Sequence, residues 1–204
     1  MKPPASTTIL GIETSCDETA AAVLDGEGHV LANVISSQQT VHERFGGVVP
    51  ELASRAHIQN VDHVTRQALD AAGLTWQDLG AIAVTQGPGL AGALLVGISY
   101  AKSLAYALGI PLVGVSHLEG HIASAWIDRP SFPRTCVVLI ASGGHTHLFH
   151  ATEHGGFHLM GRTIDDAAGE AFDKGAQLLG LGYPGGPLIA AAARKGSPAA
   201  VRFP

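Results

Sequence analysis

The amino-acid sequence predicts an α/β protein made of two lobes. Three observations predict this fold class. Three short apolar segments joined by turns open the chain, a strand–helix–strand alternation lies within residues 80–115, and the opening layout returns from residue 135. Of the 204 residues, 46% are hydrophobic and 14% are charged, which is typical of a globular chain with a buried core.

The first lobe is expected to open with three antiparallel strands. The apolar segments at residues 8–13, 19–24 and 29–36 have strand length, and short polar turns separate them. The turn Asp25-Gly26-Glu27-Gly28, between the second and third segments, is typical of a β-hairpin. Residues 37–50 have neither a helical nor a strand period, so we predict a loop there.

A helix and a strand–helix–strand unit complete this lobe. The helix is predicted to begin at Glu51, after Pro50, and to end at Gly73, because apolar residues recur between them at helical spacing. The unit that follows is predicted to be a strand, a helix and a strand at residues 80–86, 90–109 and 111–115. A helix that connects two strands makes them parallel neighbours. This order of elements is that of a ribonuclease-H-like module, which we assign to residues 8–128.

The second lobe repeats the opening layout after a proline-containing linker at residues 128–134. Its predicted strands are residues 135–141, 145–152 and 157–164, and its predicted helices are 168–179 and 187–195. Two ribonuclease-H-like modules that face each other make the actin-like (ASKHA) nucleotide-binding architecture. We therefore predict this fold, with a second lobe at residues 134–204 that is incomplete and truncated.

Composition and charge limit the classes of function. The net charge is −5 and no run of like charges occurs, which argues against a protein that binds nucleic acid by itself through a basic surface. The two cysteines, Cys16 and Cys136, are expected to be small buried thiols in a reducing compartment. The first six residues lack the apolar stretch of a signal peptide. These features predict a cytoplasmic protein.

One apolar stretch, residues 90–115, resembles a membrane span. Lys102 stands near its middle, where a charge costs about 2.5–3.5 kcal/mol, and Gly109-Ile110-Pro111 interrupts it. We therefore expect a buried core helix and no membrane segment.

Two glycine-rich turns have different predicted roles. Residues 87–92 match the dinucleotide pattern G-x-G-x-x-G, but they follow three antiparallel strands, and no acidic residue stands about 20 positions later to bind a ribose. We interpret them as a tight strand-to-helix turn. In Ser142-Gly143-Gly144, between two predicted strands, backbone N–H groups can approach an anion, although an ordinary hairpin turn is the alternative. Gly185-Gly186 offers similar donors at a helix start, and Asp173 could bind ribose hydroxyls or be a solvated helix carboxylate.

The strongest candidate for a metal site is a pair of histidines. His117 and His121 stand at i and i+4, one above the other on a helical face, directly after a predicted parallel strand. A zinc protease of the H-E-x-x-H type needs its glutamate directly after the first histidine, whereas Glu119 is two positions on and faces away. His145 and His147, at i and i+2 on a strand, form a rival pair.

Two ligands are too few for a catalytic metal site. Candidates for a third ligand within the chain are Asp17 and Glu13, and a residue beyond Pro204 is equally compatible with the sequence.

Six ordered motifs together resemble the TsaD family of bacterial tRNA adenosine threonylcarbamoyltransferases, once described as O-sialoglycoprotein endopeptidases. They are residues 11–19 (GIETSCDET), 46–51 (GGVVPE), 87–90 (GPGL), 116–121 (SHLEGH), 142–146 (SGGHT) and 165–174 (DDAAGEAFDK). The resemblance covers nearly the whole chain, and the motifs are specific as a set rather than singly.

The resemblance implies an acyltransferase of tRNA processing. It implies transfer of a threonylcarbamoyl group from threonylcarbamoyl-AMP to N6 of adenosine 37, in tRNAs that read codons starting with A, which is the t6A modification. It also implies TsaB as a heterodimer partner, TsaE as an ATPase, and TsaC as the enzyme that makes the adenylate.

The same resemblance implies the residues of the site. His117 and His121 resemble two ligands of one divalent metal ion per subunit, Fe²⁺ or alternatively Zn²⁺. The residues implied to bind the adenylate are Ile140, Ala141, Ser142, Gly143, Gly144, Asp173 and Gly186. The family's third metal ligand, an Asp, and a further nucleotide contact, an Asn, lie in a stretch absent from this sequence. We expect the histidine pair and the Ser-Gly-Gly turn to share one pocket.

Asp17 and Glu18 follow the first strand and are candidates for a catalytic role. As a hypothesis, one of them orders the metal site or assists proton removal, and a hydrogen-bonded turn is the alternative. Other functions also stay open: a catalytically inactive scaffold of the same complex, a small-molecule kinase on the same architecture, and a metalloendopeptidase, which the position of Glu119 disfavours.

Overall fold

The computed structural model describes residues 8–127, 129, 131–153 and 155–202. Its contacts group into two compact units, Met1–His42 with Val48–Phe132 and Glu43–Gly47 with Pro133–Pro204. Three predicted features fall outside the described residues. One is the N-terminal segment, for which no signal peptide is predicted. The others are the predicted end of the first lobe at residue 128, together with position 130 of the linker, and the chain end at 203–204. Each unit contains a β-sheet of its own.

The first unit is built on a five-stranded mixed sheet with the strand order β3-β2-β1-β4-β5. Its strands are β1 (Thr8–Glu13), β2 (Glu18–Leu24), β3 (Val30–Ser37), β4 (Leu79–Gly87) and β5 (Leu112–Ser116). The first three are antiparallel neighbours, while β4 lies parallel to β1 and β5 parallel to β4. The predicted succession of three antiparallel strands and a parallel unit is therefore confirmed.

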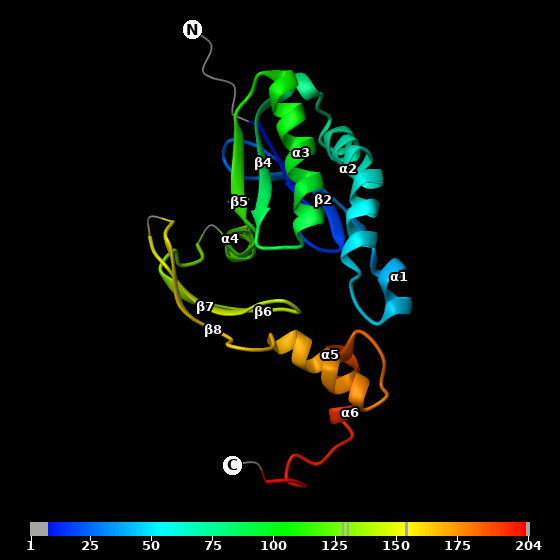
Figure 1. The fold of residues 1–204 in the computed structure, drawn as a ribbon. Coiled ribbons are helices and arrows are strands. Elements are labelled where there is room, and N and C mark those ends of the chain that lie inside the picture. The colour runs from blue at the N-terminus through cyan, green and yellow to red at the C-terminus, as the bar shows by residue number, and fades with distance from the viewer. Residues whose placement is uncertain (1–7, 128, 130, 154, 203–204) are drawn as a thin grey trace. The chain divides into compact units, whose positions relative to one another are not determined.

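Helices α2 (Pro50–Ala72) and α3 (Ala91–Leu108) lie side by side against one face of this sheet (Figure 1). The apolar stripe of α2, which includes Val61 and Val64, is buried together with Leu10 of β1 in one hydrophobic core. Gly73 ends α2 as predicted, because it adopts the left-handed conformation (φ 67°) and its N–H bonds to the carbonyl of Asp70.

Helix α3 packs through small residues on one of its sides. Its buried residues, four apart along the helix, are Ala93, Gly97, Ala101 and Ala105. On other sides Leu95 and Tyr106 are 64% and 90% exposed. Among the described helices this is the one long and apolar enough to cross a membrane, by length and composition alone. The expected core helix is thus fully buried along one side only, with larger residues such as Leu104 and Leu108 partly buried against the same core.

The loop predicted at residues 37–50 is partly helical. It contains α1 (Gln39–His42) and the short 3₁₀ helix η1 (Glu43–Phe45) before Gly46 turns the chain at φ 70°. The 2% exposed Gln38 side chain bonds to Nε2 of His42 at 3.1 Å, which fixes the helical turn. Such a short element shows no period in the sequence, so pattern reasoning missed it. Another 3₁₀ helix, η2 (Trp76–Asp78), precedes β4.

The second unit contains an antiparallel three-stranded sheet and two helices that pack together. Its elements are β6 (Cys136–Ala141), β7 (Thr146–Ala151), β8 (Phe157–Arg162), α5 (Ala168–Leu178) and α6 (Gly185–Ala193). The predicted strands and helices are present, but α6 begins at Gly185 rather than at Pro187. Close packing on α5 requires glycine there, because a Cβ at position 185 would lie 2.5 Å from the Phe172 carbonyl oxygen.

Both cysteines are free thiols, but the prediction that both are buried is wrong. Cys16 is exposed and Cys136 is half-buried. Cys16 lies in the polar turn after β1, where the chain reverses at the edge of the sheet. Although the residue is exposed overall, desolvation of its sulfur and the neighbouring charge of Asp17 raise the pKa of the Cys16 thiol to about 12, so it stays protonated at neutral pH.

Candidate metal and nucleotide sites

Three polar side chains of the first unit meet where parallel strands end. Glu13 is the last residue of β1, Thr85 lies near the end of β4, and His117 directly follows β5. Because these strands run parallel, their carboxyl ends lie at one edge of the sheet, the usual place for ligands in open α/β sheets.

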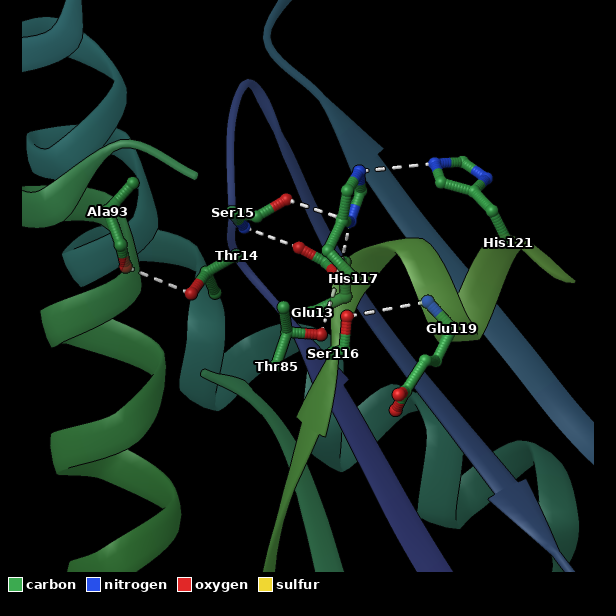
Figure 2. A network of polar contacts seen from close by, with 9 residues as sticks. All are labelled: Glu13, Thr14, Ser15, Thr85, Ala93, Ser116, His117, Glu119 and His121. Carbon is green, nitrogen blue, oxygen red and sulfur yellow. Dashed lines mark hydrogen bonds and ion pairs between the residues drawn. The ribbon is translucent and has the colours of Figure 1, made fainter. Parts of the chain in front are cut away.

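Helix α4 (His117–Ala123), which continues into the 3₁₀ helix η3 (Ser124–Trp126), carries the histidine pair. Ser116 caps its first turn by accepting a hydrogen bond from the Glu119 N–H at 3.4 Å. The helical spacing therefore places both imidazoles on one face, as predicted. The carboxylate of Glu119 points away from both rings (Figure 2).

The two imidazoles face each other through the same type of nitrogen. Nε2 of His117 and Nε2 of His121 lie 3.1 Å apart, and the rings are nearly perpendicular at 82°. Two nitrogens bound to one metal ion at about 2.0–2.1 Å, at angles between square and tetrahedral, lie about 2.8–3.4 Å from each other. The spacing of the pair therefore fits a shared cation.

The charge state of His121 also suits a metal ligand. Burial lowers the pKa of His121, and the nearby His117 lowers it further. A lowered pKa favours the neutral imidazole at pH 7, and only the neutral form offers a lone pair to a cation.

On the other side of the His117 ring lies a carboxylate (Figure 2). Glu13 Oε2 is 3.2 Å from Nδ1 of His117 and accepts a 2.6 Å hydrogen bond from the Thr85 hydroxyl. The Ser15 N–H donates to Glu13 Oε1, and the Ser15 hydroxyl lies 3.1 Å from Nδ1 of His117. Sequence reasoning missed Thr85 and Ser15, although both stand at the carboxyl ends of predicted strands.

The hydrogen bonds around Glu13 hold it as a carboxylate. Burial by itself would raise its pKa, but hydrogen bonds from His117, Ser15 and Thr85 outweigh burial and lower the pKa to about 2. Glu13 lies at the Nδ1 side of His117, and not at the two Nε2 atoms that point toward each other. Among the described residues, no group of three or more His, Cys, Asp or Glu side chains is arranged to hold a metal ion.

Asp17 and Glu18, the predicted catalytic residues, lie at the start of the β2–β3 pair. The Asp17 carbonyl accepts a 3.0 Å hydrogen bond from the Gln38 N–H, and Glu18 is exposed opposite Ser37 of β3. These contacts place both residues in a hydrogen-bonded turn and strand start. Their catalytic role stays a prediction.

The G-x-G-x-x-G segment serves close packing. The Leu90 N–H donates to the Ser15 carbonyl at 2.8 Å, and a Cβ at Gly89 would lie 2.6 Å from that same oxygen. The Thr14 hydroxyl donates to the Ala93 carbonyl at 2.9 Å in the first turn of α3. These contacts join the turn after β1 to the start of α3, which agrees with a tight strand-to-helix turn.

In the second unit, the predicted nucleotide residues gather around α5. The Ser142 N–H donates to the His145 carbonyl at 2.8 Å, which closes a hairpin turn around Gly143 and Gly144. The Ser142 carbonyl accepts a 3.0 Å hydrogen bond from the N–H of Gly169, in the first turn of α5. The glycine turn therefore packs against a helix N-terminus, where backbone N–H groups favour an anion.

The remaining predicted nucleotide residues lie on the strand and helices around this turn. Ile140 is buried in β6, Ala141 ends that strand, and Gly186 belongs to the first turn of α6. Asp173 Oδ1 accepts a 2.7 Å hydrogen bond from the Gly185 N–H. Asp173 is therefore bonded to the start of α6, next to Gly186, rather than being only a solvated carboxylate.

The rival histidine pair has a different geometry. The rings of His145 and His147 lie 5.5 Å apart and are tilted by 54°, and His147 stacks on Phe149. The geometry of the 117/121 pair, with two Nε2 atoms in direct contact, is the better fit to a metal ion. The expected pocket shared by that pair and the Ser-Gly-Gly turn stays a prediction, since the two features belong to different units.

Comparison with known proteins identifies the family. The family model described as "TsaD: tRNA N6-adenosine threonylcarbamoyltransferase" matches residues 29–204. The chain belongs to the TsaD family. This confirms the family that the six motifs indicate.

Curated TsaD relatives are similar over almost the whole of this chain. The chain is 56% identical over 196 residues to the tRNA N6-adenosine threonylcarbamoyltransferase of Clostridium perfringens, and 57% identical over 198 residues to that of Moorella thermoacetica. The matches cover 96% and 97% of this chain and 58% of each relative. The chain thus spans less than two thirds of the length of these TsaD proteins.

Solved structures confirm the fold class. YeaZ from Pseudomonas aeruginosa matches with a TM-score of 0.53 and 25% identity, over 76% of this chain and 65% of YeaZ. The ethanolamine utilization protein EutJ from Carboxydothermus hydrogenoformans matches with a TM-score of 0.52 and 17% identity, over 96% of this chain and 63% of EutJ. The predicted α/β fold of the actin-like class is therefore confirmed.

Proposed function

We propose that this TsaD chain acts in t6A modification of tRNA, transferring the threonylcarbamoyl group of threonylcarbamoyl-AMP to N6 of adenosine 37 in tRNAs that read codons starting with A. The names of the relatives at 56% and 57% identity support this activity. The observation that carries the proposal is the 3.1 Å approach of the His117 and His121 Nε2 atoms at the sheet edge, because it fits a metal-assisted acyl transfer.

His117 and His121 would hold one divalent cation, Fe²⁺ or Zn²⁺, which when bound supplies a Lewis acid that positions the threonyl group and polarises its oxygens. The lowered pKa of His121 and the spacing of the two rings support this assignment. Because two histidines leave a coordination sphere incomplete, further ligands must come from the substrate, from water, or from residues outside the described part of the chain.

For the acyl transfer the protein must hold the adenylate, stabilise the leaving phosphate and accept a proton. N6 of the adenosine attacks the carbamoyl carbon, the bond from that carbon to the phosphate oxygen breaks, and AMP leaves while N6 loses one proton. In this proposal the adenylate is held by Ile140, Ala141, Ser142, Gly143, Gly144, Asp173 and Gly186. Backbone N–H groups of the glycine turn would stabilise the leaving phosphate. Asp17 or Glu18 would accept the proton or order the site.

The partners in this proposal are TsaB as heterodimer subunit, TsaE as ATPase, and TsaC as the source of threonylcarbamoyl-AMP, all in the cytoplasm. This chain is similar in fold to YeaZ, a TsaB-type protein, and that similarity supports a structural relationship between this chain and TsaB. The net charge of −5 supports a need for partners in tRNA binding, because most of the affinity for a phosphate backbone comes from basic residues.

The test is reconstitution of the modification with the 204-residue chain. The chain is incubated with TsaB, TsaE, TsaC, threonine, bicarbonate, ATP and an unmodified tRNA, and t6A is measured by mass spectrometry of nucleosides. We expect t6A with the wild-type chain and with His63→Ala, whose side chain is exposed on α2, but not with His121→Ala.

Three results would contradict the proposal. Equal t6A formation by His121→Ala and wild type would remove the metal-binding pair from the reaction. Binding of TsaB without any t6A formation would favour the alternative, an inactive scaffold of the same complex. Cleavage of a glycoprotein would favour the metalloendopeptidase, which the outward direction of Glu119 disfavours (Figure 2).

A further inference from the structure

The ring of His117 has distinct partners on its two nitrogens. Nε2 faces Nε2 of His121 at 3.1 Å, while Nδ1 lies 3.2 Å from the Glu13 carboxylate and 3.1 Å from the Ser15 hydroxyl. A neutral imidazole carries one proton, so one of its nitrogens donates and the other accepts. The partners on each side determine which nitrogen carries the proton.

The contacts of Glu13 decide the question. Its Oε1 accepts from the Ser15 N–H, and its Oε2 accepts from the Thr85 hydroxyl at 2.6 Å. Because both oxygens of Glu13 already act as acceptors, the complementary partner at the 3.2 Å contact is an N–H, which makes Nδ1 of His117 the donor. Nε2 of His117 then carries a lone pair, and in the metal-free pair it accepts from Nε2–H of His121 at 3.1 Å. Binding of a cation between the two rings would displace this proton from Nε2 of His121.

We infer that Glu13 is a positioning residue, which holds His117 with its proton on Nδ1 and its Nε2 lone pair directed at the cation shared with His121. This inference rests on the metal site of the proposed function. Thr85 and Ser15 act through Glu13: their donors occupy both carboxylate oxygens and fix its orientation behind the ring (Figure 2). A carboxylate that accepts the second ring N–H of a metal-binding histidine fixes the ring and raises its basicity.

This role differs from that of a third metal ligand. A ligand would have to approach the Nε2 side of the pair, whereas Glu13 lies at Nδ1 and already accepts donors on both of its oxygens. With Glu13 ordering the histidine, the role left to Asp17 or Glu18 in the proposed function is to accept the proton.

Glu13→Gln is a sharp test, because glutamine has the same shape but a different set of donors. Its single carbonyl oxygen can accept on one side only. An NH₂ group in place of Oε1 meets the Ser15 N–H, which is also a donor, whereas an NH₂ group in place of Oε2 can donate to the Thr85 hydroxyl but no longer accepts from Nδ1 of His117. The matched control is Glu119→Gln, which removes the same charge from α4 while its side chain points away from the histidines (Figure 2).

The first measurement uses the metal-free chain and ¹⁵N NMR of the imidazole nitrogens. In wild type and Glu119→Gln we expect Nδ1 of His117 to be the protonated nitrogen and Nε2 the bare one. In Glu13→Gln we expect this preference to be lost. The second measurement is Zn²⁺ affinity by competition with a chromophoric chelator. We expect Glu13→Gln to bind about 10–100-fold more weakly than wild type, and Glu119→Gln to bind as wild type.

Circular dichroism shows whether Glu13→Gln folds. If it does not, Thr85→Val is the variant that tests the inference. This variant keeps the charge of Glu13 and removes one donor, so we expect a smaller loss of Zn²⁺ affinity with the Nδ1 proton retained.

A wild-type His117 with its proton on Nε2 would overturn the inference, as would equal Zn²⁺ affinities of wild type, Glu13→Gln and Thr85→Val. A wild-type chain that binds neither Zn²⁺ nor Fe²⁺ would contradict the metal site of the proposed function. The tautomer would then still show whether Glu13 sets the protonation of His117, so the two failures are distinguishable.

Discussion

Thr19 Oγ1 lies 2.8 Å from Nδ1 of His57, which joins the buried face of β2 to helix α2. The His57 side chain is fully buried, and its Nε2 lies 3.0 Å from the carbonyl of Cys16. Because a carbonyl only accepts, Nε2 carries the proton of the neutral ring, and Nδ1 accepts from the Thr19 hydroxyl. This buried histidine holds α2 against the turn that follows Glu13.

We expect the free energy of unfolding to decrease in mildly acidic solution because of His57. Burial lowers its pKa and the charge of His42 adds to this, while the Cys16 carbonyl, Glu13 and Asp17 oppose it. Below about pH 6.5 the unfolded state binds this proton and the folded state does not, so stability is complete above pH 6.5 and is lost as pH falls toward the lowered folded pKa.

Urea unfolding between pH 5 and 8 measures this effect in wild type and His57→Gln. The other histidines are present in both chains, so the difference in pH dependence isolates His57. We expect a shallower loss of stability at low pH in the variant. The same pH dependence in both chains would contradict the assignment.

Thr19→Val should destabilise the fold, since it leaves Nδ1 of a fully buried imidazole with only the longer 3.4 Å contact to Nε2 of Gln38. The expected loss is about 0.5–1.5 kcal/mol, the usual net contribution of a hydrogen bond. Chemical denaturation with a constant m-value measures it. Thr40→Val, at an exposed position of α1, is the control, and its change should stay within about 0.5 kcal/mol. Equal effects of the two substitutions would argue against the buried hydrogen bond.

Gly89→Ala tests the packing role of the G-x-G-x-x-G segment. The new Cβ would lie 2.6 Å from the Ser15 carbonyl oxygen, which is backbone and itself hydrogen-bonded to the Leu90 N–H. Relieving this overlap should cost about 1–3 kcal/mol of stability. Gly47→Ala, where a Cβ meets open space, is the matched control. A neutral Gly89→Ala variant would show that glycine at this position serves something other than packing.

The sequence predicts elements better than it predicts the contacts between them. Strands such as β1 and helices such as α2 follow from local periodicity, and the i,i+4 spacing of His117 and His121 places them on one helix face. The carboxylate behind His117 comes from position 13 and its donor from position 85, at sequence separations of 104 and 72 residues. No local pattern encodes such partners, although strand-end polar residues in parallel strands indicate the region where they meet.

Asp173 should contribute to stability independently of any nucleotide. Its Oδ1 accepts the Gly185 N–H at the start of α6, which resembles a helix cap supplied from a neighbouring helix. We expect Asp173→Ala to lower the unfolding free energy by about 0.5–2 kcal/mol, and Asp173→Asn, which keeps a carbonyl acceptor, to lower it less. Denaturation of the nucleotide-free chain measures both. Equal losses would show that the charge, rather than the hydrogen bond, is what α6 requires.

Removal of a bound metal should lower the thermal stability of the wild-type chain. A ligand that binds only the folded state stabilises it by about 2.7 kcal/mol at a free concentration 100 times its Kd. We therefore expect the melting temperature of the chelator-treated chain to rise when Zn²⁺ or Fe²⁺ is added. His121→Ala should gain much less, because its loss leaves one imidazole of the facing pair. His63→Ala, exposed on α2, should respond like wild type. A gain of the same size in His121→Ala would place the responsive metal elsewhere on the chain, since histidine 121 would then contribute nothing to its binding.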